Sequence, residues 1–326
     1  MNFWVSPSTF RLSLASLLCS AALLVQAQPA SAPAAASAAP SALAAARSNF
    51  ATKVALPPSN AGAAPTAPES VFRTVKYPSP VGALAAYLTP DPKDGKRHPA
   101  IIWITGGDCN SIGNVWRAAP PSNDQTASAF RRAGIAMMFP SLRGGNTNPG
   151  KREAFYGETQ DILAAADFLA SQPYVDSQRI YLGGHSTGGT MVLLTAEITS
   201  RFRAVISFGP VASGEVYGQD LLPVDFSKLD ARETQLRRPA LWLDSIRSRT
   251  LVLEGEEGGN GYHLNLMKKL NRNPMVTFVP VPGANHFSIL APANALLARK
   301  IIEDVGPNST LSVSASEITT AGSDSR

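Results

Sequence analysis

The sequence predicts an α/β protein with a mostly parallel, doubly wound sheet. Short apolar runs alternate with helical stretches over one continuous region, and several of these runs are apolar at successive positions. Such runs are typical of parallel strands that crossover helices cover on both faces. The composition, with 44% hydrophobic and 16% charged residues, is that of a globular chain and excludes a disordered chain, a rod and a polytopic membrane protein.

Residues 1–27 predict a secretory signal peptide. Arg11 precedes a 14-residue apolar run, and small residues stand before a cleavage point after Ala27. That run is shorter than the roughly 20 residues of a membrane-spanning helix. We therefore expect an exported protein, periplasmic or secreted, with no integral membrane span in its mature chain. A lipid anchor on Cys19 fits less well, because the bulky Leu18 precedes the cysteine.

Residues 28–68 predict a flexible linker, because Ala, Pro and Ser supply 17, 7 and 5 of these 41 positions and few large apolar side chains remain. Residues 69–306 predict one folded domain, and residues 307–326 a polar tail that frays. Removal of the signal peptide leaves Cys109 without a second cysteine, so we expect no internal disulfide.

The elements of the domain follow from its hydrophobic pattern and its turn residues. We expect strands at residues 71–78, 82–90, 100–107, 135–144, 179–186, 204–211, 250–257 and 276–283, and helices at residues 153–172, 188–200, 263–271 and 293–305. Residues 213–243 form an insertion that contains Tyr217, Phe226 and Trp242, and we expect a small lid there.

The motif Gly184-His185-Ser186-Thr187-Gly188 matches G-x-S-x-G and stands between a predicted strand and a predicted helix. In this context the serine lies on a strained turn that flanking glycines permit, and its hydroxyl is presented at the carboxyl edge of the sheet. Ser186 is therefore the candidate nucleophile.

The sequence resembles the α/β-hydrolase superfamily, and within it the prolyl oligopeptidase and dienelactone hydrolase branch. The resemblance rests on residues 161–189, on Pro140-Ser141-Leu142-Arg143-Gly144 and on Gly283-Ala284-Asn285-His286-Phe287. It implies the α/β-hydrolase fold and a serine hydrolase. Prolyl oligopeptidases carry a propeller before this domain, which residues 28–68 cannot form, so the resemblance favours an esterase over a peptidase.

A serine hydroxyl needs an imidazole base, and a carboxylate must orient that base. His286 follows a predicted strand in the loop before the last helix, where the chain order of this superfamily places the base. The resemblance places the acid in the loop after residues 250–255, where Gly258 occupies the usual aspartate position. We favour Glu257, with Glu256 and Glu254 as alternatives.

Two backbone N–H groups are needed to stabilise the oxyanion of the tetrahedral intermediate. Thr187 follows the nucleophile and supplies one. By resemblance to the His-Gly-Gly motif of the family, Gly107 supplies the other, with Asp108 as the alternative. Cys109 is interpreted as a packing residue, and Arg143 as a structural brace paired with Glu158 or Asp161.

We expect no metal and no organic cofactor, because the four histidines are isolated and show no metal-ligand spacing. The basic residues are scattered, so nucleic-acid binding is not expected either. The sequence predicts an exported serine hydrolase that acts on a carboxylic ester, a lactone or a small peptide. A peptidase of the prolyl oligopeptidase type and an inactive hydrolase-fold binding module are the alternatives, and the oligomeric state stays open.

Overall fold

The strands form one eight-stranded sheet in the order β1-β2-β4-β3-β5-β6-β7-β8. The computed structural model describes residues 1–4 and 39–323, so most of the predicted signal peptide lies outside the described residues. β1 and β2 pair antiparallel, as do β2 and β4, and every other neighbouring pair is parallel. The strands are β1 (Arg73–Ser79), β2 (Gly82–Leu88), β3 (His98–Ile104), β4 (Ala136–Pro140), β5 (Val175–His185), β6 (Ala204–Phe208), β7 (Arg249–Gly255) and β8 (Val276–Val281).

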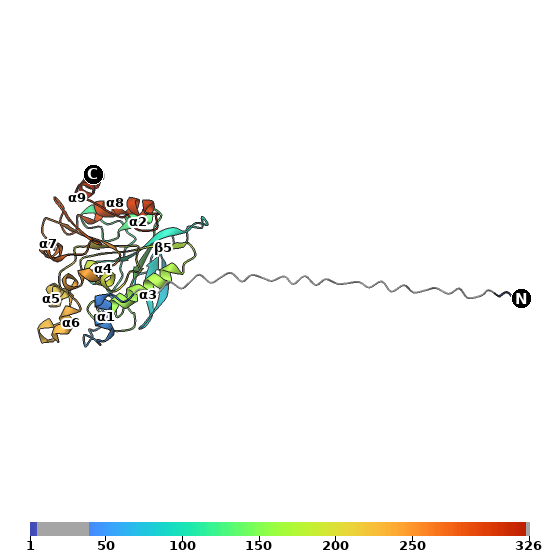
Figure 1. The fold of residues 1–326 in the computed structure, drawn as a ribbon, viewed down its shortest axis with the longest axis horizontal. Helices are drawn as coiled ribbons and strands as arrows, with labels where there is room; N and C mark the ends of the chain where they lie inside the picture. The colour runs from blue at the N-terminus through green and yellow to red at the C-terminus, as the bar shows by residue number, and fades with distance from the viewer. Residues whose placement is uncertain (5–38, 324–326) are drawn as a thin grey trace. The chain divides into compact units, whose positions relative to one another are not determined.

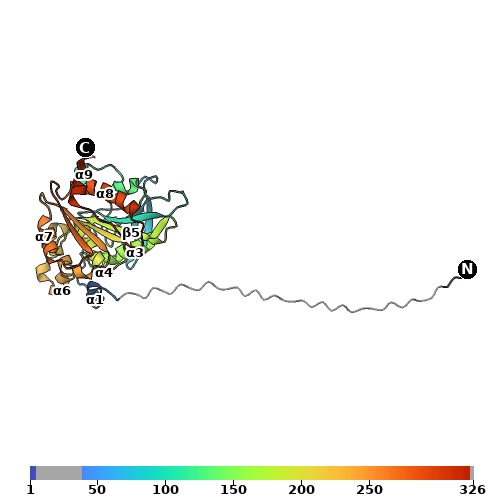
Figure 2. The same cartoon turned by 45° about the horizontal axis from the view of Figure 1, so that its top comes forward.

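Helices cover both faces of this sheet, as the uniformly apolar strands predict. Figure 1 shows α2, α8 and α9 on one side and α1, α3 and α4 on the other, and Figure 2 again shows α8 and α9 on the opposite side from α1, α3 and α4. Each face has its own core, one containing Leu182 and Leu193, the other Trp103 and Phe208. The helices are α1 (Ala42–Ser48), α2 (Ser128–Arg132), α3 (Glu158–Ala170), α4 (Thr187–Ile198), α7 (Gly261–Leu270), α8 (Leu290–Glu303) and α9 (Ala315–Ser323).

The predicted lid is a series of short helical turns between β6 and β7. They are η2 (Gly214–Tyr217), α5 (Gly218–Leu221), η3 (Phe226–Lys228), α6 (Ala231–Gln235), η4 (Pro239–Leu241) and η5 (Leu243–Ser245), and one more turn, η1 (Pro121–Asn123), precedes α2. None of the described helices is both long enough and apolar enough to cross a membrane.

The predicted linker is wrong for its described part, because residues 41–56 are packed onto the domain. Ser41 caps α1 and donates a hydrogen bond to the Glu197 carbonyl at 2.6 Å. Leu43 is fully buried. The Arg47 guanidinium donates to the Phe155, Tyr156 and Leu236 carbonyls. A few anchoring side chains therefore compensate for a composition dominated by Ala, Pro and Ser.

The predicted polar tail is also wrong over its described part. α9 packs against α8, and the side chains of Leu311, Val313 and Ile318 are buried in the core on that face. These three apolar residues are too widely spaced to produce a strong periodic pattern in the sequence. α9, which contains Ile318, contacts α8 and β8, so only the tertiary fold makes this segment a packing surface.

Candidate active site

Ser186 occupies a sharp turn between β5 and α4 with φ 57° and ψ −116°, a backbone conformation that non-glycine residues rarely adopt. A Cβ on Gly188 would collide with the Ile104 carbonyl oxygen, and one on Gly184 would lie 2.6 Å from the Gly188 carbonyl oxygen. These two glycines therefore allow the turn to form. The Ser186 N–H donates to the Phe208 carbonyl at 2.8 Å, which ties the turn to the end of β6.

His286 lies in the loop between β8 and α8 and is paired with Glu254. The Nδ1 atom of His286 is 2.7 Å from the Oε2 atom of Glu254, whose side chain is 1% exposed. The N–H groups of Gly255 and Asn260 donate to the same carboxylate at 2.8 and 3.3 Å. This carboxylate is thus held in place to orient the imidazole.

The preferred partner of His286, Glu257, is therefore corrected to Glu254. Glu256 and Glu257 follow the end of β7 and are exposed, whereas Glu254 is the penultimate residue of that strand and is buried. The chain then turns through Gly258 and Gly259, both at positive φ. The Glu257 N–H donates to the Ala284 carbonyl at 2.9 Å, so the contribution of this residue to the histidine loop is a backbone contact.

Ser186 and His286 both lie beside the turn that follows β6. Phe208 accepts the hydrogen bond from Ser186, and a Cβ on the next residue, Gly209, would lie 2.5 Å from Cε1 of His286 and 2.6 Å from Oε2 of Glu254. Gly209, at φ 55°, therefore leaves the space in which the imidazole and its carboxylate lie. The structure brings these two sequence-predicted residues to one edge of the sheet.

His185 holds the loop that contains His286 in place. Its Nε2 atom donates to the His286 carbonyl at 2.9 Å, and its Nδ1 atom accepts from the Gln125 side-chain amide at 2.8 Å. Burial, together with the nearby His286, lowers the pKa of His185 to about 3, so the ring stays neutral at ordinary pH. Its two nitrogen atoms are thus occupied, and His185 is a positioning residue.

The predicted oxyanion donors lie next to each other. The Thr187 hydroxyl donates to the Gly107 carbonyl at 2.8 Å, which joins the start of α4 to the loop after β3. Within residues 39–323, neither the Thr187 N–H nor the Gly107 N–H donates a hydrogen bond to the protein. The carboxylate of Asp108 is paired, because it accepts hydrogen bonds from the Ser59 hydroxyl and the Asn110 N–H.

Cys109 and Tyr217 complete the immediate surroundings. Burial raises the pKa of the Cys109 thiol far above its ordinary value, so this thiol is a packing group. Burial likewise raises the pKa of Tyr217, which keeps the phenol neutral. The Tyr217 hydroxyl is 2.7 Å from the Thr190 hydroxyl in the first turn of α4. The lid therefore reaches the helix that follows the candidate nucleophile.

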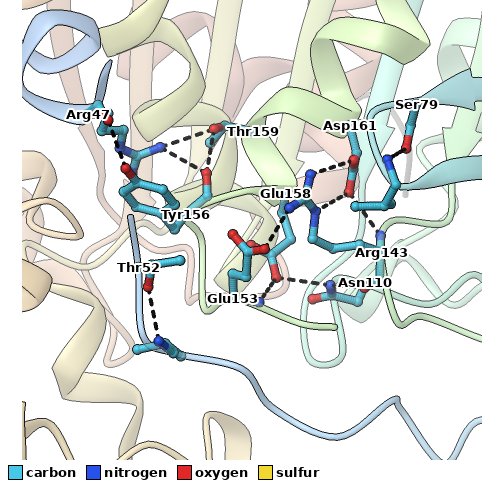
Figure 3. A network of polar contacts seen from close by, with 12 residues as sticks. Arg47, Thr52, Ser79, Asn110, Arg143, Glu153, Tyr156, Glu158, Thr159 and Asp161 are labelled. Atoms are coloured by element: carbon cyan, nitrogen blue, oxygen red, sulfur yellow. Dashed lines mark hydrogen bonds and ion pairs between the residues drawn. The ribbon is translucent and has the colours of Figure 1, made fainter. Parts of the chain in front are cut away.

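A buried polar network holds the loop of Gly107 (Figure 3). Asn110 donates from its side-chain amide to the Arg143 carbonyl at 2.9 Å and to Glu158 at 3.3 Å. The Arg143 guanidinium binds both carboxylate oxygens of Asp161, at 2.9 and 3.0 Å, and Glu153 at 2.8 Å. Of the two carboxylates expected to pair with Arg143, Asp161 does so, and Glu153 is the second partner in place of Glu158.

Sequence reasoning did not single out Asn110, Gln125 or residues 50–60 as parts of the site. Asparagine and glutamine carry no charge and titrate nowhere, so the sequence offers no chemical signal for them. No group of three or more His, Cys, Asp or Glu side chains that could hold a metal ion occurs in the described part of the chain.

Residues 121–257 match the prolyl oligopeptidase family. The chain is 25% identical over 233 residues to dipeptidyl-peptidase 5 of Porphyromonas gingivalis, covering 64% of this chain and 33% of that protein. This chain spans less than half the length of the first curated relatives that it matches, between 33% and 42%.

Two solved structures share the fold. Puromycin hydrolase superposes with a TM-score of 0.56 at 19% identity, over 73% of this chain and 40% of that one. An esterase of Pyrobaculum calidifontis superposes with a TM-score of 0.52 at 18% identity, over 72% of this chain and 86% of that one. The chain is an α/β-hydrolase-fold protein whose residues 121–257 resemble the prolyl oligopeptidase family.

Proposed function

We propose that this chain is a serine hydrolase that acts through an acyl-enzyme on carboxylic esters, lactones or small peptides. The observation that carries the proposal is the 2.7 Å contact between His286 Nδ1 and the buried Glu254 carboxylate beside the strained Ser186 turn. In this arrangement the carboxylate fixes the ring, and the remaining nitrogen, Nε2, is left for the serine. Ser186, His286 and Glu254 are the proposed triad.

In the proposed reaction, the Ser186 hydroxyl oxygen bonds to the substrate carbonyl carbon while its proton passes to Nε2 of His286. The Thr187 and Gly107 N–H groups stabilise the oxyanion of the intermediate. The bond to the leaving group then breaks, the leaving oxygen or nitrogen takes the proton from His286, and the acyl group stays on Ser186. Water attacks this ester by the same route, releasing the acid and restoring the serine.

A serine-directed fluorophosphonate probe tests the proposal. We expect Ser186 to be labelled in the full chain and labelling to disappear in Ser186→Ala. Ser213→Ala, a substitution in the lid, is the matched control and retains labelling. Absence of labelling in the wild-type chain would favour the alternative of an inactive hydrolase-fold binding module.

A peptidase of the prolyl oligopeptidase type is the second candidate, because residues 121–257 match that family and one relative is named a dipeptidyl-peptidase. We expect esters to react faster than proline-containing peptides, because an ester has the better leaving group. Comparing kcat/KM for a series of aryl esters with kcat/KM for such peptides tests this. A clear advantage for the peptides would reverse the order of the two candidates.

Export is part of the same proposal and rests on the sequence of residues 1–27. We expect the mature chain to begin at Gln28 and to be found outside the cytoplasm. N-terminal sequencing of material recovered from the exported fraction tests both statements. Recovery of a chain that retains residues 1–27, or of one with a lipid on Cys19, would contradict them.

A further inference from the structure

Residues 50–60, here called the strap, cross from the lid to the loop of the proposed oxyanion hole. At the lid end, the Thr52 hydroxyl and the Lys53 N–H donate to the Glu233 carboxylate on α6 at 2.8 and 2.6 Å. Arg237 binds the same carboxylate at 2.6 Å and donates to the Thr52 hydroxyl at 2.7 Å. The lid end of the strap is therefore fixed by a buried ion pair.

The other end of the strap is fixed beside the oxyanion loop. The Ser59 hydroxyl donates to the Asp108 carboxylate, and the Ser59 N–H donates to the Gly144 carbonyl at 2.7 Å. Between the two ends, the Leu56 N–H donates to the Arg152 carbonyl at 2.8 Å. Leu56 is thus held by its own backbone hydrogen bond and by the fixed strap ends on either side of it.

The strap and the lid share a small apolar cluster that is separate from the two main cores. Its buried members are Val54 and Leu56 of the strap, Val224 of the lid, and Ala154, with Leu222 and Phe226 packed against them. Leu56 and Leu222 also face a small cavity, whereas Val54 does not. The cluster therefore has one strap residue that reaches the cavity and one that does not.

This cavity adjoins the proposed oxyanion donors, since Gly107, Thr187, Cys109 and Phe155 line it together with Leu56 and Leu222. Its interior volume is about 20 Å³. A space of this size holds about one water molecule, or a methyl group in its place. A longer chain enters only if a wall residue moves.

The position of the cavity identifies the part of the substrate that it accepts. A carbonyl carbon bonded to Ser186 carries the oxyanion, the acyl chain and the leaving group. The leaving group must face His286, because that residue gives it a proton. The described lining residues come from the strap, the lid, the loops after β3 and β4 and the start of α4, and not from the loops of Glu254 and His286. The cavity is on the acyl side.

We propose that Leu56 closes the acyl cavity and restricts this chain to esters of short acyl groups, with acetyl esters as the preferred class. The proposal rests on the proposed serine hydrolase function. It assigns a specificity-determining role to a residue far from Ser186 in the sequence. The composition of residues 28–68 gives no indication of this role.

The test compares the wild type, Leu56→Ala and the matched control Val54→Ala on p-nitrophenyl acetate, butyrate and hexanoate. We expect the kcat/KM of the wild type to fall with chain length. In Leu56→Ala we expect kcat/KM for the hexanoate, divided by kcat/KM for the acetate, to rise by about tenfold or more. The reason is that one methylene in an apolar pocket changes discrimination between substrates by about 10- to 200-fold. Val54→Ala removes two methyl groups from the same cluster and keeps the wild-type ratio of the kcat/KM values.

Two results would overturn the proposal: an unchanged ratio in an active Leu56→Ala, or an equal rise in Val54→Ala. If Leu56→Ala does not fold, Leu56→Val replaces it, because valine keeps a branched side chain in the cluster. We expect Leu56→Val to raise the same ratio of kcat/KM values by a smaller factor. An unchanged ratio in Leu56→Val would also refute the role of Leu56 in closing the cavity. Failure of the proposed function itself is recognised separately, because the wild type would then show neither esterase activity nor fluorophosphonate labelling at Ser186.

Discussion

Glu254 lies inside β7, whereas Glu256 and Glu257 follow the end of that strand. β7 pairs with β8 through Gly255, so Glu254 belongs to the sheet and its side chain is buried beside the histidine loop. Glu256 and Glu257 are beyond the strand and exposed. A carboxylate on a strand is held more rigidly than one in a loop, and the N–H of Gly255 contributes to this at 2.8 Å.

We expect Glu254→Gln to lower kcat by about 10²- to 10⁴-fold, because an amide in this position disrupts the orientation and tautomer of His286. The matched control, Glu257→Gln, changes an exposed side chain three residues away and leaves kcat within about twofold. Steady-state kinetics on one aryl ester, with thermal unfolding to verify the fold, decides between them. A larger loss of kcat in Glu257→Gln than in Glu254→Gln would instead make Glu257 the carboxylate that orients His286.

α1 packs over the end of α4, and Glu197 there is completely buried. Neither carboxylate oxygen of Glu197 has a hydrogen-bond partner among the described residues. Burial raises the pKa of this carboxyl well above its ordinary value of 4.5, although the positive charge of Arg47 opposes the shift. The carboxyl group therefore favours the protonated form in the folded chain.

This shift makes stability depend on pH. A carboxyl whose pKa is raised by folding binds a proton more tightly in the folded chain, so its contribution to stability is full below pH 4.5 and decreases as pH rises toward the folded pKa. We expect Glu197→Gln to lose this dependence and to gain about 1 kcal/mol or more over the wild type at pH 8. Thermal unfolding from pH 4 to pH 8 measures the difference. Glu69→Gln, an exposed change, has the same pH profile as the wild type.

Residues 40–68 are structural, so their removal destabilises the domain. A chain that begins at residue 69 lacks the buried Leu43, the Arg47 hydrogen bonds and the strap. We expect its Tm to be lower by about 10 °C or more, from the loss of several kcal/mol. A chain that begins at residue 40 is the matched control, and we expect it to unfold like the full chain. Equal Tm values for the chains that begin at residues 40 and 69 would support the interpretation of residues 40–68 as a flexible linker.

The fold class and most strands were predictable because hydrophobic burial in the sheet leaves continuous apolar runs. The turn at Ser186 was predictable because it demands glycines at fixed positions in the sequence. The Glu254 contact was not, since three nearby glutamates differ only in where β7 ends. Leu43 was missed because its burial depends on α4, which lies far away in the sequence, and Leu311 because the segment after α8 shows no helical periodicity.

The carboxyl-terminal segment is tied to the sheet by Asp304. Burial raises the pKa of this carboxyl, but hydrogen bonds from Arg203, Tyr181 and Thr310 outweigh it and lower the pKa below its ordinary value. A lowered pKa contributes stability above the unfolded value of 3.8 and loses it as pH falls.

We therefore expect Asp304→Asn to cost about 3–5 kcal/mol at pH 7, because it leaves Arg203 without its buried partner. The difference from the wild type shrinks as the pH falls below 4. Chemical denaturation at several pH values measures both effects. Glu303→Gln, next to it and exposed, is the control and costs within about 0.5 kcal/mol. A cost in Asp304→Asn that did not depend on pH would show that packing, and not charge, holds the segment.

The strap also determines when the proposed pocket is completed. Thr52 and its partner Glu233 are 181 residues apart, so the strap is synthesised long before the lid to which it binds. Such long-range contacts form late in folding, because the intervening chain must first become ordered. Until the lid is made, Leu56 therefore lacks its packing partners there, and the wall of the proposed acyl cavity is incomplete. The proposed selection among acyl chains therefore begins only when the strap, near the start of the described domain, meets the lid.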